Sequence, residues 1–245
     1  SQVQADQLPA LPSGSSGKKV CIIDSGIDGT HEDLVGLTMS GKNYTTSGSW
    51  NTDEGAHGTH VAGTIAAVDN TLGVVGVAGG KQLPLYISKV FDASGSASSI
   101  TVAKGMIGCL VSRSNVVSMS LGSSSPSNIE KKVLDALEAR GALLVAAAGN
   151  DGTSALHYPA SFPNVISVAA NDDTESWATF SQFNAEVDIS GPGVAVLSTV
   201  PPNVLTMGVL TVNGGAYSVQ AMTGSPVLSA TGPLADFGFG DTPAA

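Results

Sequence analysis

Two histidines stand three residues apart in the stretch EGAHGTHVAG, residues 54–63, among glycines and other small residues. At this spacing His57 and His60 share one face of a helix, an arrangement that can hold a metal ion. Alternatively, one of them is a catalytic base and the other packs in the interior. No third metal ligand stands beside the pair. The spacing alone leaves both interpretations open.

Three more residues that can do chemistry end apolar segments of strand length. Asp24 ends VCIID, Ser120 ends VVSMS and Asn150 ends LLVAAAGN. The carboxyl ends of parallel strands meet at one edge of a sheet, and helix starts such as the one at His57 point to the same edge. We therefore expect an acid, an imidazole and an amide to converge. Taken singly, Asp24 and Asn150 are also compatible with turns.

Together, Asp24, His57 and Asn150 have the parts of an acyl-transfer site. A buried aspartate fixes the tautomer of a histidine and stabilises its imidazolium, while the histidine removes a proton from a nucleophile. The Asn150 amide would donate to the developing oxyanion, a contact typically worth about 3–4 kcal/mol in the transition state. The hypothesis is therefore nucleophilic acyl transfer.

The elements that would position these residues alternate between strand and helix. We expect strands at 18–24, 84–90, 115–120, 142–148, 164–170 and 194–200, and helices at 57–67, 98–112 and 129–140. The last helix has a capping box of Ser127 and Glu130 and a stop at Gly141. Apolar strands alternating with helices predict an α/β fold whose mostly parallel sheet is covered on both faces.

Composition excludes several classes of partner. The net charge of −10 comes from ten basic and twenty acidic residues with no basic cluster, which argues against nucleic acid and membrane surfaces. No apolar run approaches the roughly 18 residues needed to cross a bilayer. There is no GxGxxG after a strand and no P-loop, so a nucleotide site is not indicated. The chain opens without Met or a signal peptide, so we expect a processed product or an excised piece.

Five blocks of the chain resemble, in order, those of the subtilisin-like serine proteases: VCIIDSGIDGTHEDL, HGTHVAGTIAA, VVSMSLG, LLVAAAGNDG and YPASFPNVISVAA. The resemblance runs from about residue 18 to about residue 200. It implies a subtilisin-like three-layer sandwich in which Asp24 is the orienting acid, His57 the general base and Asn150 the oxyanion donor. His60 is then a packed residue.

The resemblance also implies a secreted, extracellular protein made as a zymogen. This location bears on Cys21 and Cys109, which by themselves permit one disulfide but are equally compatible with two buried thiols. Disulfides persist in oxidising, extracellular surroundings. The resemblance therefore favours a Cys21–Cys109 bond.

A peptide-binding cleft is a further implication of the resemblance. In the family an extended substrate adds as a strand to two backbone segments, here within 94–98 and at 120–122. The first specificity pocket would lie between 120–122 and 147–150, whose small apolar walls would admit large uncharged side chains. The expected substrate-binding residues are Gly95, Ser96, Ser120, Leu121, Gly122, Ala147, Ala148 and Gly149. Proteins or peptides are the expected partners.

The stretch AAVDNTLGVVGVA resembles the family's calcium loop. The implied ligands of a structural calcium ion are the carboxylate of Asp33, the side chain of Asn70 and the carbonyls of Val68, Leu72 and Val74. Hard oxygen ligands of this mix suit calcium. A further family ligand, a glutamine near the mature N-terminus, has no secure counterpart in Gln2.

The family's nucleophile block, Gly-Thr-Ser-Met-Ala at the start of a long buried helix, does not occur in these 245 residues. Ser225 is the alternative nucleophile, but the sequence after it reads as strand and turn. Some secreted relatives carry a β-rich protease-associated insert before this block. We therefore predict that 1–200 form the N-terminal part of a catalytic core, incomplete at its C-terminus, and that 201–245 begin such an insert.

The sequence thus predicts a secreted subtilisin-like serine endopeptidase whose catalytic serine lies on a C-terminal fragment. This chain alone should be inactive or nearly so. The competing hypothesis is an inactive fragment or pseudoprotease that binds peptides or an inhibitor through the retained cleft.

Overall fold

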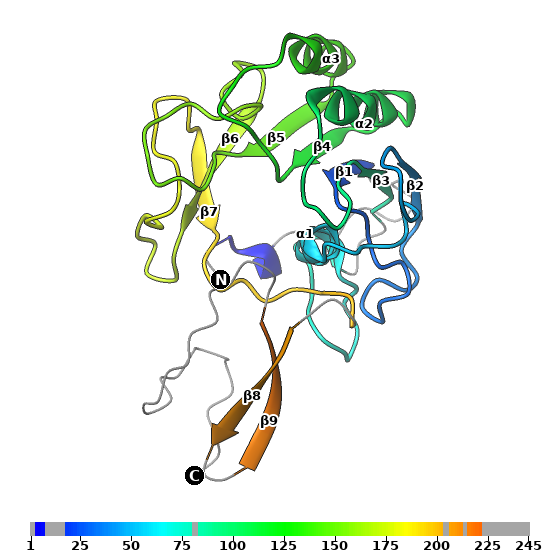
Figure 1. Cartoon of the computed structure of the whole chain (residues 1–245), viewed down its shortest axis with the longest axis vertical. Helices are drawn as coiled ribbons and strands as arrows, with labels where there is room; N and C mark the ends of the chain where they lie inside the picture. The colour runs from blue at the N-terminus through cyan, green and yellow to red at the C-terminus, as the bar shows by residue number, and fades with distance from the viewer. Residues whose placement is uncertain (1–2, 8–17, 80–82, 203–205, 213–214, 222–245) are drawn as a thin grey trace. The chain divides into compact units, whose positions relative to one another are not determined.

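The computed structural model describes residues 3–7, 18–79, 83–202, 206–212 and 215–221 (Figure 1). The chain divides into two compact units, Ser1–Val204 and Leu205–Ala245. The second unit contains an antiparallel hairpin of β8 (Thr206–Val212) and β9 (Gly215–Ala221). Ser225, the alternative nucleophile, lies outside the described residues. That 201–245 begin an insert stays a prediction.

The first unit is an α/β fold built on one parallel sheet, as the alternation of apolar strands and helices predicted. The described strands run in the order β2-β3-β1-β4-β5-β6-β7, and every neighbouring pair is parallel. The strands are β1 (Val20–Asp24), β2 (Met39–Asn43), β3 (Leu85–Lys89), β4 (Val116–Met119), β5 (Leu143–Ala147), β6 (Ile166–Asn171) and β7 (Ile189–Pro192). The helices are η1 (Ala5–Gln7), α1 (His57–Ala66), α2 (Ser99–Val111) and α3 (Asn128–Glu138).

Strand β1 is buried on both faces, and its alternating side chains enter two separate cores. Cys21 and Ile23 pack in the core under α2 and α3, whereas Val20 and Ile22 pack with α1. Figure 1 shows α2 and α3 side by side, with α1 across the sheet from them. Because successive strand residues point to opposite faces, Asp24 shares the side of Val20 and Ile22. The sheet therefore directs Asp24 toward the helix that begins at His57.

A disulfide between Cys21 and Cys109 ties β1 to α2 across a sequence separation of 88. Cys21 points to the α2 face of the sheet and Cys109 lies on the buried side of α2. The bond that the extracellular resemblance favours is thus present in the structure.

The two faces of β4, β5 and β6 differ in how well they are covered. On the α2–α3 face, alternate residues such as Val117, Leu144 and Ser167 are buried. On the opposite face, the intervening Val145 and Val168 are only half-buried. The chain connects β2 to β3 through α1, and β3 to β4 through α2. Both connections move in the same direction along the strand order but lie on opposite faces of the sheet. One crossover is therefore left-handed and the other right-handed. Among the described helices, α1 alone covers that face.

The expected strand at 194–200 is wrong. The seventh strand is Ile189–Pro192, and the segment after it runs beside α1 without pairing in the sheet. Ser198 Oγ donates to the His60 carbonyl at 2.7 Å, and Thr199 Oγ1 donates to the Thr59 carbonyl at 2.8 Å. A Cβ on Gly63 would lie 2.2 Å from Thr199 Oγ1, so a glycine there lets the segment approach the helix. Hydroxyl side chains therefore hold this segment on the helix, whereas its apolar residues Val194 and Leu197 are exposed.

Candidate active site

Asp24 and His57 form a direct acid–imidazole pair. Asp24 Oδ1 and Oδ2 lie 2.8 and 3.0 Å from His57 Nδ1, and the backbone N–H of Ser25 donates to Asp24 Oδ1 at 2.7 Å. The Asp24 side chain is 1% exposed, whereas that of His57 is 55% exposed. The carboxylate thus holds one ring nitrogen while the ring stays accessible to a reactant.

The start of α1 is held by side chains from outside the helix. Ala56, the N-cap residue, has a left-handed backbone (φ 61) and supplies no side-chain cap. Instead, Ser25 Oγ accepts the Gly58 N–H at 2.9 Å, and Asp53 Oδ2 accepts the Thr59 N–H at 2.8 Å. Ser25 Oγ in turn donates to Asp53 Oδ1 at 2.7 Å. These bonds satisfy helix N–H groups and connect the helix start to the residue after Asp24.

A buried lysine fixes the loop that leads into α1. Lys89 is fully buried and is the register partner of Asp24 on β3. Its Nζ donates to the Thr52 carbonyl at 2.9 Å and forms an ion pair with the Glu54 carboxylate. Burial by itself would raise the pKa of Glu54, but the hydrogen bond and charge of Lys89, together with hydrogen bonds from the backbone and Thr52, lower it. The loop is thereby anchored directly before His57.

The two histidines of the opening stretch have different surroundings. The hydrogen bond to Asp24 raises the pKa of His57 despite partial burial, and the charge of Asp53 raises it further. Burial lowers the pKa of His60, whose Nε2 donates to the Val196 carbonyl at 3.1 Å. His57 therefore faces an acid, while His60 is used in packing. Among the described residues, no cluster of three or more acidic, histidine or cysteine side chains could hold a metal ion.

Asn150 and Ser120 lie at the same sheet edge as Asp24. Ser120 directly follows β4 and Asn150 follows β5, two strands that pair in parallel beside β1. Asn150 is exposed and makes no recorded hydrogen bond to Asp24 or His57 within the described part of the chain. The structure thus joins Asp24 to His57 directly and places Asn150 at their edge.

His157, which the sequence analysis did not single out, lies between two of the predicted peptide-binding segments. His157 fits between them: a Cβ on Gly122 would lie 2.4 Å from its Nδ1, and one on Gly149 would lie 3.0 Å from its Cγ. The Nδ1 atom is buried without a hydrogen-bond partner in the described structure. The backbone N–H of His157 donates to Ser161 Oγ at 3.1 Å, which fixes the turn. The one sequence feature that could have pointed to His157 is its position directly before the YPASFP block.

The remaining substrate-binding residues lie on the rim and walls of this region. Gly95 and Ser96 are both exposed in the turn before α2, where Gly95 has a positive φ of 68° and open space around it. Leu121 is half-buried, Ala148 and Gly149 are buried, and Ala147 ends β5. A backbone edge with open space on one side is a surface to which an extended chain can add.

The predicted calcium residues include one buried carboxylate, that of Asp33, and two of the others bond directly to Asp33. Asp33 Oδ2 accepts the Val74 N–H at 2.8 Å, and the Val68 N–H donates to the Asp33 carbonyl at 2.8 Å. Asn70 Oδ1 accepts the Leu72 N–H at 2.6 Å, which curls the loop. Asp33 Oδ1 is buried and has no hydrogen-bond partner among the described residues. A buried carboxylate oxygen with no donor is what a bound cation would satisfy, so the residues fit a calcium ion.

Comparisons with known proteins agree with this geometry. Residues 15–229 match the Subtilase family model, Peptidase_S8. The chain is 39% identical to Subtilisin DY of Bacillus licheniformis over 92% of this chain and 81% of that protein. It is 39% identical to Subtilisin Savinase of Lederbergia lenta over 93% of this chain and 81% of that protein.

Among solved structures, the psychrophilic subtilisin-like protease Apa1 from an Antarctic Pseudoalteromonas is 44% identical, with a TM-score of 0.72. The match covers 82% of this chain but 47% of the Apa1 chain, so this chain spans less than half of that protein. The fold is therefore subtilisin-like, as the five sequence blocks predicted. A family match over most of the chain, together with these relatives, shows that the protein belongs to the subtilase family of serine proteases.

Proposed function

We propose that this chain supplies the acid, base and oxyanion donor of a secreted subtilisin-like endopeptidase that cleaves proteins or peptides. The contact between Asp24 and His57 Nδ1 carries the proposal. A carboxylate at Nδ1 selects the tautomer with its proton on that nitrogen, which leaves Nε2 free to accept a proton. The exposed fraction of the ring gives a nucleophile access to Nε2.

In the proposed reaction a serine hydroxyl attacks the substrate carbonyl while its proton passes to His57 Nε2. Asp24 stabilises the resulting imidazolium, and the Asn150 side-chain amide donates to the oxyanion. His57 then gives the proton to the amine, which leaves, and the acyl group stays on the serine as an ester, the acyl-enzyme. A water molecule then attacks the ester and gives a proton to His57, and His57 passes that proton to the serine oxygen as the acid product leaves.

We assign the serine to a segment outside residues 1–245. The half-buried Val145 and Val168 support this assignment, because an apolar sheet face is stable when another element covers it. A helix carrying the nucleophile at its start, packed on this face beside α1, would reach the sheet edge that holds His57. Residues 201–245 would begin an insert before that helix.

For the peptide, we propose that the backbone of residues 94–98 and 120–122 takes an extended substrate. The first specificity pocket then lies between 120–122 and 147–150, and His157 closes its far side. Contacts of the His157 ring with both glycine walls support this placement. A pocket with an imidazole wall is shallower than one walled only by small residues.

We also propose a structural calcium ion held by Asp33, Asn70 and the carbonyls of Val68, Leu72 and Val74. The ion would neutralise the buried carboxylate and fix the loop on α1. Removal of calcium with EGTA should lower the melting temperature, and Asp33→Asn should make the protein insensitive to EGTA. Asp173→Asn, an exposed site, is the matched control. A wild-type melting temperature unaffected by EGTA would contradict the ion.

Fluorophosphonate labelling tests the catalytic proposal. The purified protein, with any co-purifying fragment, is labelled and analysed by intact mass and peptide mapping. We expect the label on a serine of a separate C-terminal piece, and we expect Asp24→Asn to slow labelling by about 10⁴-fold. A label at Ser225 would overturn the assignment of the serine. Absence of label and of casein cleavage would favour a peptide-binding fragment or pseudoprotease.

A further inference from the structure

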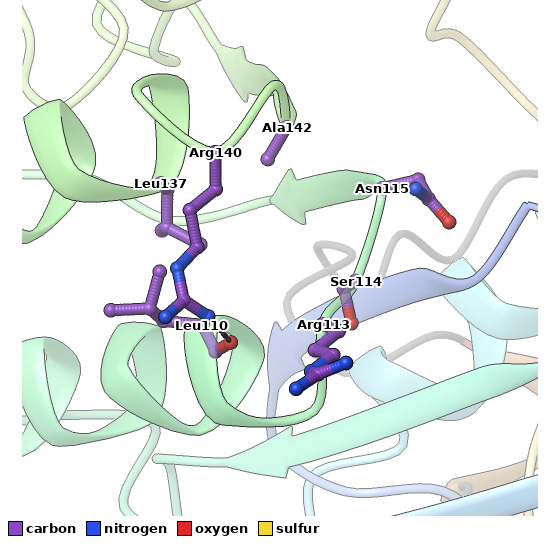
Figure 2. Close-up of a pocket in the computed structure, with 7 residues that line it drawn as sticks. All are labelled: Leu110, Arg113, Ser114, Asn115, Leu137, Arg140 and Ala142. Atoms are coloured by element: carbon purple, nitrogen blue, oxygen red, sulfur yellow. Dashed lines mark hydrogen bonds between the residues drawn. The ribbon is translucent and has the colours of Figure 1, made fainter.

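A cavity of about 240 Å³ lies where α2 and α3 end, and it takes no part in the proposed reaction. Its lining comes from the last turns of both helices and from the segments that lead into β4 and β5 (Figure 2). The lining residues are Leu110, Arg113, Ser114, Asn115, Leu137, Arg140 and Ala142. Because Asn115 precedes β4 and Ala142 precedes β5, the cavity lies at the amino ends of these strands, opposite the edge that holds His57.

Both arginines of this acidic chain line the cavity, Arg113 just after the end of α2 and Arg140 just after the end of α3. Twenty acidic residues are available in the sequence, yet neither guanidinium forms an ion pair with a described residue. Arg113 makes no side-chain hydrogen bond within the described part of the chain, and Arg140 Nη1 reaches the Leu110 carbonyl at a long 3.5 Å. The ammonium of Lys19, bonded to the Ser112 carbonyl at 2.9 Å, adds positive charge at the same end.

The helix ends do not need these guanidinium groups as caps. At the end of α2, Ser114 N–H donates to the Cys109 carbonyl at 3.1 Å and Arg113 N–H to the Leu110 carbonyl at 3.2 Å. At the end of α3, Ala142 N–H donates to the Leu137 carbonyl at 3.1 Å. Such backbone bonds satisfy the last carbonyls of a helix. Both arginines are exposed, so their guanidinium donors face solvent and are accessible to a ligand.

The rest of the lining is partly apolar. Leu137 is buried, Leu110 and Ala142 are half-buried, and Figure 2 shows Leu110 and Leu137 facing each other across the gap that Arg140 spans. A ligand that fits such a lining has an anionic head, which a planar guanidinium binds in two-point fashion, and an apolar group. An aliphatic carboxylate meets both requirements, whereas a bare inorganic anion meets only the first.

We propose that this cavity, termed the arginine pocket, binds the C-terminal carboxylate of a peptide whose last side chain is apolar. The carboxylate lies between the guanidinium groups of Arg113 and Arg140, and the side chain packs on Leu110, Leu137 and Ala142. Since the pocket is at the opposite sheet edge from the Asp24–His57 pair, its occupancy leaves the catalytic cleft open. The site is independent of the proposed peptidase reaction.

An NMR titration of the ¹⁵N-labelled protein with N-acetyl-L-leucine at low ionic strength tests this proposal. We expect saturable shifts of the Ser114, Asn115 and Arg140 amides, with a dissociation constant on the order of 1 mM, as befits so small a ligand. Arg140→Gln and Arg113→Gln should each weaken binding by about tenfold, and the double variant should abolish it. Lys132→Gln, an exposed change of equal charge on α3 outside the pocket, should leave binding unchanged.

Two further ligands test the role of the arginines and the role of the apolar walls separately. N-acetyl-L-leucinamide has the same side chain without the charge, and inorganic phosphate has charge without the side chain. Both should bind at least about tenfold more weakly than the acid. Equal binding of the amide would overturn the role of the arginines, and equal binding of phosphate would overturn the role of the apolar walls. Absence of saturable shifts with N-acetyl-L-leucine would overturn the site.

Discussion

Asp53 accepts two hydrogen bonds from Thr59, one from its backbone N–H at 2.8 Å and one from its hydroxyl at 2.6 Å. Asp53 is 5% exposed and precedes the helix that it caps. The same carboxylate accepts a bond from Ser25, the neighbour of Asp24. One buried acid therefore sets the start of α1, and with it His57, relative to the strand that carries Asp24.

Replacing Asp53 should separate its structural contribution from its electrostatic one. Asp53→Ala removes the cap and should lower the free energy of unfolding by about 1–3 kcal/mol. Asp53→Asn keeps an acceptor for Thr59 but removes the charge that raises the pKa of His57, so that pKa should fall. NMR titration of the His57 ring measures it. An unchanged His57 pKa in Asp53→Asn would show that the aspartate acts through geometry alone.

The raised pKa of His57 also has a consequence for stability. A group whose pKa is higher in the folded than in the unfolded state makes its full contribution to stability when the pH is below its unfolded pKa. For histidine the unfolded pKa is about 6.5. This contribution is lost as the pH rises through the folded pKa. Replacing His57 by glutamine should therefore destabilise the protein more at acidic than at alkaline pH. Urea unfolding of His57→Gln and the wild type at about pH 6 and pH 9 checks the sign, since their difference should shrink at the higher pH.

The ion pair of Lys89 with Glu54 should behave as a partly buried pair. In Glu54→Gln, the fully buried ammonium of Lys89 loses its carboxylate partner and keeps its bond to the Thr52 carbonyl. The free energy of unfolding should fall by about 2 kcal/mol, a value between those typical of exposed and of buried ion pairs. Adding Lys89→Met to that variant should recover most of the loss, because the uncompensated charge disappears. Urea denaturation of the four proteins completes the cycle. Additive losses would mean that the two side chains are not coupled.

Breaking the bond between Cys21 and Cys109 should lower the free energy of unfolding by about 2–4 kcal/mol, because the bond closes a long loop in the unfolded chain. The variant Cys21→Ala/Cys109→Ala and the wild type in reductant should lose similar amounts. Reductant should not affect the double variant, which serves as the control. Reaction of both wild-type thiols with iodoacetamide before reduction would contradict the bond.

His157 should limit the size of the residue that enters the first specificity pocket. In the complete enzyme, His157→Ala should raise kcat/KM for a large aromatic residue before the scissile bond, relative to alanine, by about tenfold. His157→Gln retains a side chain of similar reach and should stay near the wild-type ratio. Identical ratios for all three proteins would place His157 outside the pocket.

The sequence predicted what depends on local patterns. The length and apolarity of VCIID indicated a buried strand, and its last residue was therefore expected at the carboxyl edge with the helix start at His57. Of the capping box predicted at Ser127, the structure shows the N-cap half, in which Ser127 Oγ accepts the Glu130 N–H at 3.4 Å. The pairing of Cys21 with Cys109 needed the resemblance as well, because two thiols alone do not indicate a bond.

The features that the sequence missed depend on contacts between distant segments. Asp53 and Ser25 cap α1 together, although Ser25 precedes the helix by a whole strand–loop unit. His157 lies beside Gly122 because a downstream turn folds back onto the exit of β4. The segment 194–200 has the apolar character of a strand, but the glycine on α1 that admits Thr199 decides its place.

The bonds from Val196, Ser198 and Thr199 to α1 also shape how a nucleophile would be delivered. They fasten residues 196–199 to α1 within one helical turn of His57. A serine that arrives on the continuation of this chain is thus tethered near the base, and its encounter with His57 is intramolecular. A serine on a separate piece does not have this raised effective concentration near His57. Its binding to the site would then depend on how well the surfaces of the two pieces fit.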